Sequence, residues 1–240
     1  MLKCGGKEYL FIHIPKTAGT SICKRFFNGK EVTHRKLTSY PRELWKKSFA
    51  IIRNPYERLA SVYNYAKMVK SYWHSNDETT VYNLHPLYKY CNEHTFKEFV
   101  SDLFKKRFSN DQLVHLREQS WYLLTPGNKI ESNIIRFESI NLDLSKLFGE
   151  DISLPVINKS LKELHSFDDE MIAMINEIYK NDFINFGPFE VPTIENNNKY
   201  EITAEDEDTV DQLLDGLLQE LENDFDTDLW KSTDIDTCSL

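Results

Sequence analysis

The chain has 240 residues, of which 40% are hydrophobic and 28% charged, which is enough to bury a sizeable core in one ordinary domain. No apolar run reaches the roughly 18 residues that a membrane span requires, and the polar start MLKCGGKEYLFIHI lacks the features of a secretory signal. The four cysteines are scattered without CxxC spacing, so the sequence supports neither a zinc site nor a disulfide framework. We expect a soluble, non-exported protein with reduced thiols.

Charge divides the chain into two parts. Residues 190–240 contain 16 acidic and 2 basic side chains, which leaves 22 acidic and 27 basic side chains for residues 1–189. A mildly cationic body suits a small anionic ligand better than nucleic acid, for which a concentrated basic stripe is expected. We therefore predict a catalytic domain at 1–190, no nucleic-acid partner, and an appended acidic segment at 191–240.

Three apolar runs along the chain predict strands. Residues 9–14 (YLFIHI) end at a proline and are followed by a helical pattern that begins at Thr20. Residues 48–55 (SFAIIRNP) repeat this arrangement before a second helical stretch, YERLASVYNYA, and residues 132–137 (SNIIRF) resemble a third buried strand. Strands that alternate with helices predict an α/β fold with a central parallel sheet flanked by helices.

Three later segments have other patterns. Residues 64–94 are rich in Tyr, Trp, His and Asn without a clean period, which makes them a candidate lid or acceptor loop, and residues 95–108 have helical spacing. After the polar connector 191–201, apolar residues with helical spacing predict an acidic amphipathic helix. This helix either packs on its own domain or forms a partner contact such as a homodimer.

The stretch from residue 9 to residue 21, YLFIHIPKTAGTS, has the outline of an anion-binding loop. A loop between a strand and a helix offers unpaired backbone N–H groups and the positive end of the helix dipole, and Gly19 allows close approach. Lys16 adds a charge, and the stretch lacks the Lys-Ser/Thr pair with which nucleotide-hydrolysing P-loops hold phosphate and Mg²⁺. The alternative is a plain turn with a solvated lysine.

A second anion site is predicted after the next strand. Arg53 ends that strand, and Ser61 lies two helical turns later. An arginine can bind a terminal phosphate with two hydrogen bonds, and a serine can add a supporting one. Taken alone, this pair is a weak signal because both residue types are common at such positions.

Together the two stretches resemble the sulfotransferases that use 3′-phosphoadenylyl sulfate (PAPS), in particular the carbohydrate branch with HIPKTxGTS near its start. FIHIPKTAGTS is similar to that family's 5′-phosphosulfate loop, and IIRNPYERLASVYNY is similar to its 3′-phosphate motif. The resemblance continues through HLREQSWYL, NIIRFESI, LPVINKS and IYKNDFINFG and covers most of residues 9–187. It implies the sulfotransferase fold, which is related to P-loop nucleotide kinases.

The resemblance also implies roles for single residues. Lys16 would contact the phosphosulfate, Arg53 and Ser61 would hold the 3′-phosphate, and Ala18 stands where many relatives have glycine. The remaining residues predicted to bind PAPS are Thr17, Ala18, Gly19, Thr20, Ser21, Lys159 and Ser160.

Candidates for the general base are His13, His34, His115 and Glu118. His13 lies inside the first apolar run and is interpreted as a hydrogen-bonded core residue. His34 lies in EVTHRKL, a short strand-like segment, and related sulfotransferases place their catalytic histidine in the same interval. We predict His34 as the base, Lys16 as the electrophilic stabiliser, and Glu138 as a structural partner of a nearby N–H group or arginine.

Acceptor-binding residues are harder to identify from the sequence. His115 and Glu118 precede a tryptophan in a helical stretch, where either could face the acceptor. Trp73 belongs to an aromatic segment that either stacks on sugar rings or packs an irregular lid.

The predicted reaction is transfer of a sulfuryl group from PAPS to a hydroxyl, on a carbohydrate or glycolipid acceptor. It needs no metal, by analogy with metaphosphate-like transfer. The sequence shows no membrane anchor of the kind that Golgi relatives carry, so we expect a cytoplasmic enzyme. Two alternatives stay open, namely a small-molecule kinase that uses the loop for ATP with Mg²⁺, and a non-catalytic nucleotide-binding protein.

Overall fold

The computed structural model describes residues 1–30, 32–68, 84–108, 113–155 and 165–193. The chain divides into two units, Met1–Ile194 and Glu195–Leu240, and every described residue belongs to the first. The predicted connector beyond residue 193 and the acidic C-terminal helix lie outside the described residues, as do Trp73, Lys159 and Ser160.

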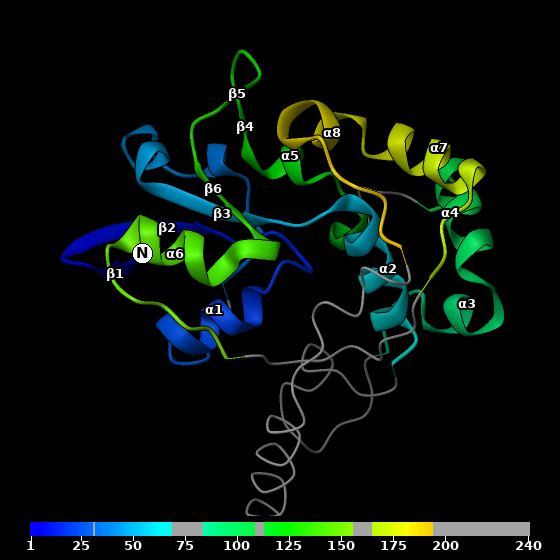
Figure 1. The fold of residues 1–240 in the computed structure, drawn as a ribbon, viewed down its shortest axis with the longest axis horizontal. Coiled ribbons are helices and arrows are strands. Elements are labelled where there is room, and N and C mark those ends of the chain that lie inside the picture. The colour runs from blue at the N-terminus through cyan, green and yellow to red at the C-terminus, as the bar shows by residue number, and fades with distance from the viewer. Residues whose placement is uncertain (31, 69–83, 109–112, 156–164, 194–240) are drawn as a thin grey trace, which may run out of the picture. The chain divides into compact units, whose positions relative to one another are not determined.

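A four-stranded sheet lies at the centre of the first unit (Figure 1). Its order is β1 (Leu2–Cys4), β2 (Lys7–Ile12), β3 (Ser48–Ile52) and β6 (Asn133–Arg136). The pairs β2–β3 and β3–β6 are parallel, whereas β1 pairs with β2 antiparallel, so the sheet is mixed. The three predicted strands are thus confirmed, and the short β1, which the sequence analysis did not identify, extends the sheet at one edge.

The apolar runs form strands because both faces of the sheet are covered. Phe49 and Ile51 of β3 pack with α1 (Gly19–Phe26) and α6 (Ile140–Phe148) on one face. Ala50 and Ile52 pack on the other face with α5 (Gln119–Leu123) and α8 (Lys180–Phe186). All five residues of β3 are buried, which explains why this central strand is apolar without alternation.

A second group of helices packs beside the sheet (Figure 1). It consists of α2 (Pro55–Ala66), α3 (Tyr88–Glu93), α4 (Phe96–Phe104) and α7 (Asp169–Ile178), which share one apolar cluster. The remaining strands, β4 (Leu124–Thr125) and β5 (Lys129–Ile130), form a small antiparallel pair. Among the residues that the structure describes, no helix is long and apolar enough to cross a membrane.

The structure corrects two predicted elements. Residues 32–36 form no strand: the Val32 carbonyl accepts from the imidazole of His13, and the Arg35 N–H donates to the Thr33 carbonyl within the segment. The imidazole of His34 reaches back to the His13 carbonyl. The segment 64–94 is regular at both described ends, since α2 continues to Ala66 and Tyr88–Glu93 is helical. Residues 69–83 between them lie outside the described residues.

Candidate functional site

The parallel strands β2 and β3 end at the same edge of the sheet, and each continues there into a helix. We call residues 13–18, between β2 and α1, the first corner, and residues 53–54, between β3 and α2, the second corner. Ligands of open α/β sheets bind outside the carboxyl ends of the strands, so both corners lie at the edge where a ligand is expected.

The first corner has an unusual backbone. Lys16 has φ 67° and Ala18 has φ 64°, so two non-glycine residues lie in the left-handed region. Ala18 is also the N-cap of α1, which has no side-chain cap and no acidic residue in its first turn. The N-terminal N–H groups of α1 are therefore uncapped by side chains, which is the arrangement that suits an anion.

Two of the predicted anion-binding residues have additional roles in this corner. The Thr17 hydroxyl donates to the Ile14 carbonyl at 2.8 Å, so its proton is used inside the corner. A Cβ atom at Gly19 would lie 1.7 Å from Nε2 of His13, so this glycine makes room for the imidazole. Contacts of Thr17 and Gly19 with an anion, through their backbone N–H groups, stay predictions.

His13 is buried, and its Nδ1 lies 2.6 Å from the Val32 carbonyl oxygen. Burial, and then the charge of His34, lower the pKa of His13 to about 3, so the ring is neutral at physiological pH. A neutral ring beside a carbonyl carries its proton on Nδ1 and donates it there. These contacts agree with the interpretation of His13 as a core histidine.

His34 lies against the first corner through its ring. Its Nδ1 is 3.0 Å from the His13 carbonyl oxygen, and its ring centroid is 4.1 Å from that of His13. Because a carbonyl oxygen can only accept, Nδ1 of His34 carries a proton, and in the neutral form of the ring Nε2 then carries the lone pair. His34 is half-buried, and this tautomer is the one that a general base acting through Nε2 requires.

The side chain of Lys16 extends from the first corner to α2. Its Nζ is 3.8 Å from the centroid of the Tyr65 ring, which belongs to α2. Burial, and then the nearby charge of Arg53, lower the pKa of Lys16 to about 7. Tyr65 was not predicted, although it follows Ser61 by one turn on the same helix, and this spacing could have indicated it.

The second corner is held differently. The Arg53 Nε lies 3.3 Å from Oε2 of Glu57, and its guanidinium carbon lies 4.4 Å from the centroid of the Phe137 ring. Asn54 caps α2 by accepting from the N–H of Tyr56 at 3.1 Å. The N–H of Asn54 donates to Oε1 of Glu138 at 3.1 Å, which agrees with the predicted structural role of that carboxylate.

Arg58 joins the first corner to a more distant segment. Only 1% of this residue is exposed, and its Nε donates to the Pro15 carbonyl at 3.0 Å. Its Nη2 donates to the carbonyls of His115 and Arg117 at 3.0 and 2.9 Å. The sequence analysis did not single out Arg58, because a buried arginine that binds backbone carbonyls leaves no pattern beyond a second arginine in RNPYER.

The structure brings His115 to the site. Its ring centroid lies 6.4 Å from that of His34 and 5.3 Å from that of His85, a residue that the sequence analysis did not single out. Burial, and then the charges of His85, His34 and Lys16, lower the pKa of His115 to about 2. In the described part of the chain, these histidines and the other His, Cys, Asp and Glu residues form no cluster that could hold a metal ion.

Glu118 has structural partners instead. Its carboxylate accepts from the backbone N–H and the side-chain amide of Asn181, both at 2.9 Å, near the start of α8. These contacts tie α5 to α8, and a role of Glu118 in acceptor binding stays a prediction.

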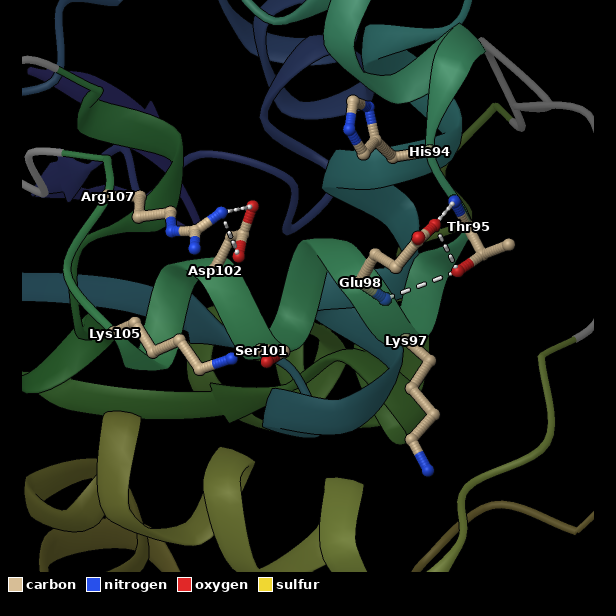
Figure 2. A pocket seen from close by; sticks show the side chains of 8 residues that line it. All are labelled: His94, Thr95, Lys97, Glu98, Ser101, Asp102, Lys105 and Arg107. Carbon is tan, nitrogen blue, oxygen red and sulfur yellow. Dashed lines mark hydrogen bonds and ion pairs between the residues drawn. The ribbon is translucent and has the colours of Figure 1, made fainter.

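A separate hollow of about 570 Å³ lies along α4 (Figure 2). Most of its charged side chains are already paired, because Arg107 binds Asp102, Glu98 binds Thr95, and Lys97 binds acidic residues of α7 and its N-cap. None of the residues that line it was predicted as a site residue. The hollow therefore offers no cluster of unpaired charges to an anion.

Comparison with known proteins gives the family of the chain. Residues 3–189 match the model of the sulfotransferase family. This range includes nearly all of the sheet, both corners and all the described helices. Neither the curated proteins nor the solved structures that were searched gave a match. The matched region is well over half of the chain, and the protein therefore belongs to the sulfotransferase family.

Proposed function

We propose that the chain transfers a sulfuryl group from PAPS to a hydroxyl of a carbohydrate or glycolipid acceptor. Membership of the sulfotransferase family supports the type of reaction. The observation that carries the proposal is the position of Lys16 and Arg53 just after two adjacent parallel strands, with His34 bonded to the first corner at the same edge of the sheet.

The donor set of the two corners suits a ligand with two separate anionic groups. The first corner offers the uncapped N–H groups of α1 and the Lys16 ammonium, which suit a 5′-phosphosulfate. The second offers the Arg53 guanidinium, with Ser61 on the helix α2 that follows it, which suits a 3′-phosphate. When bound, PAPS supplies the sulfuryl group, whose bond to the 5′-phosphate breaks as a bond to the acceptor oxygen forms.

Lys16 is proposed to stabilise the negative charge that develops on the leaving phosphate. The face of Tyr65 and the left-handed backbone at Lys16 hold the amine in place before a ligand arrives. Preorganised cations of this kind act in the transition state without further rearrangement.

His34 is proposed to take the proton of the acceptor hydroxyl on Nε2. Its Nδ1–H stays bonded to the His13 carbonyl, which fixes the ring and stabilises the imidazolium that forms. The low pKa values of His13 and His115, about 3 and about 2, make these two rings unsuitable to hold that proton near neutral pH.

The carbohydrate acceptor, the cytoplasmic location and a homodimer through the C-terminal helix rest on the sequence alone. HIPKTAGTS supports the carbohydrate branch by resemblance, and the acidic helix supports the dimer by its apolar stripe. Trp73, Lys159 and Ser160 belong to the same proposal as contacts of the acceptor and the nucleotide.

To test this proposal, the protein is incubated with ³⁵S-labelled PAPS and a panel of glycans and glycolipids in a buffer that contains EDTA. Transfer of ³⁵S to an acceptor is the expected result. Transfer of phosphate from ³²P-labelled ATP that depends on Mg²⁺ would instead favour the kinase. Binding of adenosine 3′,5′-bisphosphate without transfer to any acceptor would favour the non-catalytic alternative.

A further inference from the structure

The side chain of Gln119 pairs with the backbone of Arg53 in both directions. The Arg53 N–H donates to Oε1 of Gln119 at 2.9 Å, and Nε2 of Gln119 donates to the Arg53 carbonyl at 2.8 Å. A residue of a neighbouring antiparallel strand would exchange the same two hydrogen bonds. The carboxamide thus replaces a strand at a point where the sheet has ended.

Strand pairing stops before it reaches Arg53. The last paired residue of β3 toward β2 is Ala50, and the last toward β6 is Ile52. Backbone groups at such a strand end need other partners when they are shielded from water. Gln119 is fully buried and supplies both of them for Arg53.

Asp182 of α8 holds Gln119 in turn. One carboxylate oxygen of Asp182 accepts from the backbone N–H of Gln119 at 2.9 Å, and the other accepts from the N–H of Ser120 at 2.7 Å. The first oxygen also lies 3.4 Å from Nε2 of Gln119, which orients the carboxamide. Asp182 is fully buried as well, so a continuous buried chain of hydrogen bonds runs from α8 to the second corner.

We propose that Gln119 is a positioning residue for the 3′-phosphate, which it serves by fixing the backbone of Arg53, while Asp182 orients Gln119. This inference rests on the proposed function, in which Arg53 binds that phosphate. A guanidinium can donate two hydrogen bonds to one phosphate only if the backbone that carries it is correctly placed. Gln119 fixes the backbone of Arg53 in its position.

If Gln119 had only a structural role, its replacement would lower the stability of the protein without a specific link to Arg53. The two roles differ in a double-mutant cycle on ligand affinity, measured by calorimetry with adenosine 3′,5′-bisphosphate. Gln119→Met keeps the length of the side chain but removes both hydrogen bonds. We expect it to weaken bisphosphate binding by roughly tenfold in the wild-type background and by less than about twofold in an Arg53→Ala background.

The matched control is Tyr56→Phe. Tyr56 lies on α2 three residues after Arg53, is buried, and donates through its hydroxyl to Asn176 at 2.6 Å. This variant loses a hydrogen bond near the corner but none to Arg53, so its bisphosphate affinity should stay within about twofold of the wild type. Equal losses from Gln119→Met in both backgrounds, or no loss in either, would overturn the inference.

Two further measurements cover a folding defect and a failure of the proposed function. If Gln119→Met does not fold, Asp182→Asn takes its place in the same cycle with the same expected pattern. Amide hydrogen exchange at Arg53 can be measured without a ligand. Its rate should be at least tenfold higher in Gln119→Met than in Tyr56→Phe. If wild-type protein does not bind the bisphosphate, the proposed function fails, whereas unchanged exchange at Arg53 overturns the role of Gln119.

Discussion

The two corners follow neighbouring strands of one sheet, but the helices that begin there have different N-termini. At the first corner, α1 begins after a left-handed Ala18 with no side-chain cap and no acid in its first turn. At the second, Asn54 caps α2, Pro55 brings no N–H group to its first position, and Glu57 lies in its first turn. The N-terminal N–H groups of α1 are thus available to an anion, whereas α2 begins with a proline and has a side-chain cap.

This difference suggests how the work divides between them. An anion at the first corner can be held by the helix N-terminus and Lys16, close to His34, so changes there should affect the transfer step. An anion at the second corner must be held by side chains, above all by Arg53, so changes there should affect affinity. Substitutions at each corner can separate these two roles.

Replacing the proposed base should give the largest effect on rate. We expect His34→Ala to lower kcat by about 10²–10⁴, because a positioned base contributes that much to proton transfer. The affinity for adenosine 3′,5′-bisphosphate should stay within about threefold, since the base contacts the acceptor. Steady-state kinetics with PAPS and calorimetry measure the two quantities.

The control for this variant is His94→Ala, because His94 is half-buried, stacks on Tyr90 and lies at the separate hollow along α4. It should leave kcat unchanged. A His34→Ala enzyme with wild-type kcat would show that another group takes the proton.

Loss of the lysine of the first corner should come next. We expect Lys16→Ala to lower kcat by about 10²–10³, the typical cost of one group that stabilises developing charge. Lys24→Ala removes an exposed lysine of α1 and should leave kcat nearly unchanged. Equal effects from both lysines would mean that only the general positive charge of this region matters.

The charge of Lys16 predicts a pH dependence of binding. With its pKa lowered to about 7, the amine loses its proton as the pH rises above that value, whereas a bound phosphate favours the ammonium form. Binding of the bisphosphate at about pH 8 should therefore take up close to one proton, and affinity should fall as the pH rises. Calorimetry in buffers of different ionisation enthalpy measures this uptake.

Lys16→Arg provides the comparison for this measurement, because a guanidinium stays protonated throughout the range. Proton uptake should disappear in that variant. Uptake of equal size in Lys16→Arg would assign the titration to another group.

The smallest expected effect concerns the backbone of the first corner. Ala18→Gly removes the cost of about 1–2 kcal/mol of a left-handed alanine but adds chain entropy to the unfolded state, so we expect a gain of up to about 1 kcal/mol in the free energy of unfolding. Ala173→Gly, at an exposed helical position of α7, should instead lose about 1 kcal/mol. Urea unfolding compares the two, and a loss in both would show that Ala18 is unstrained.

The sequence predicted the parts of the site that follow local rules. The apolar runs that became β2, β3 and β6 and the polar residues that follow them could be identified because strands and helix starts have short-range patterns. The strand expected around His34 was wrong, because side-chain contacts with His13 replaced ladder pairing. Gln119, Asp182 and Arg58 could not be foreseen, since each binds the backbone of a residue more than 40 positions away.

Calorimetric titration with adenosine 3′,5′-bisphosphate, beside ATP and ADP, measures whether the two corners bind this nucleotide in preference to the others. We predict micromolar affinity for the bisphosphate, much weaker binding of ATP and ADP, and a large but still measurable loss of bisphosphate affinity in Arg53→Ala. A preference for ATP, or full bisphosphate affinity without Arg53, would contradict this prediction.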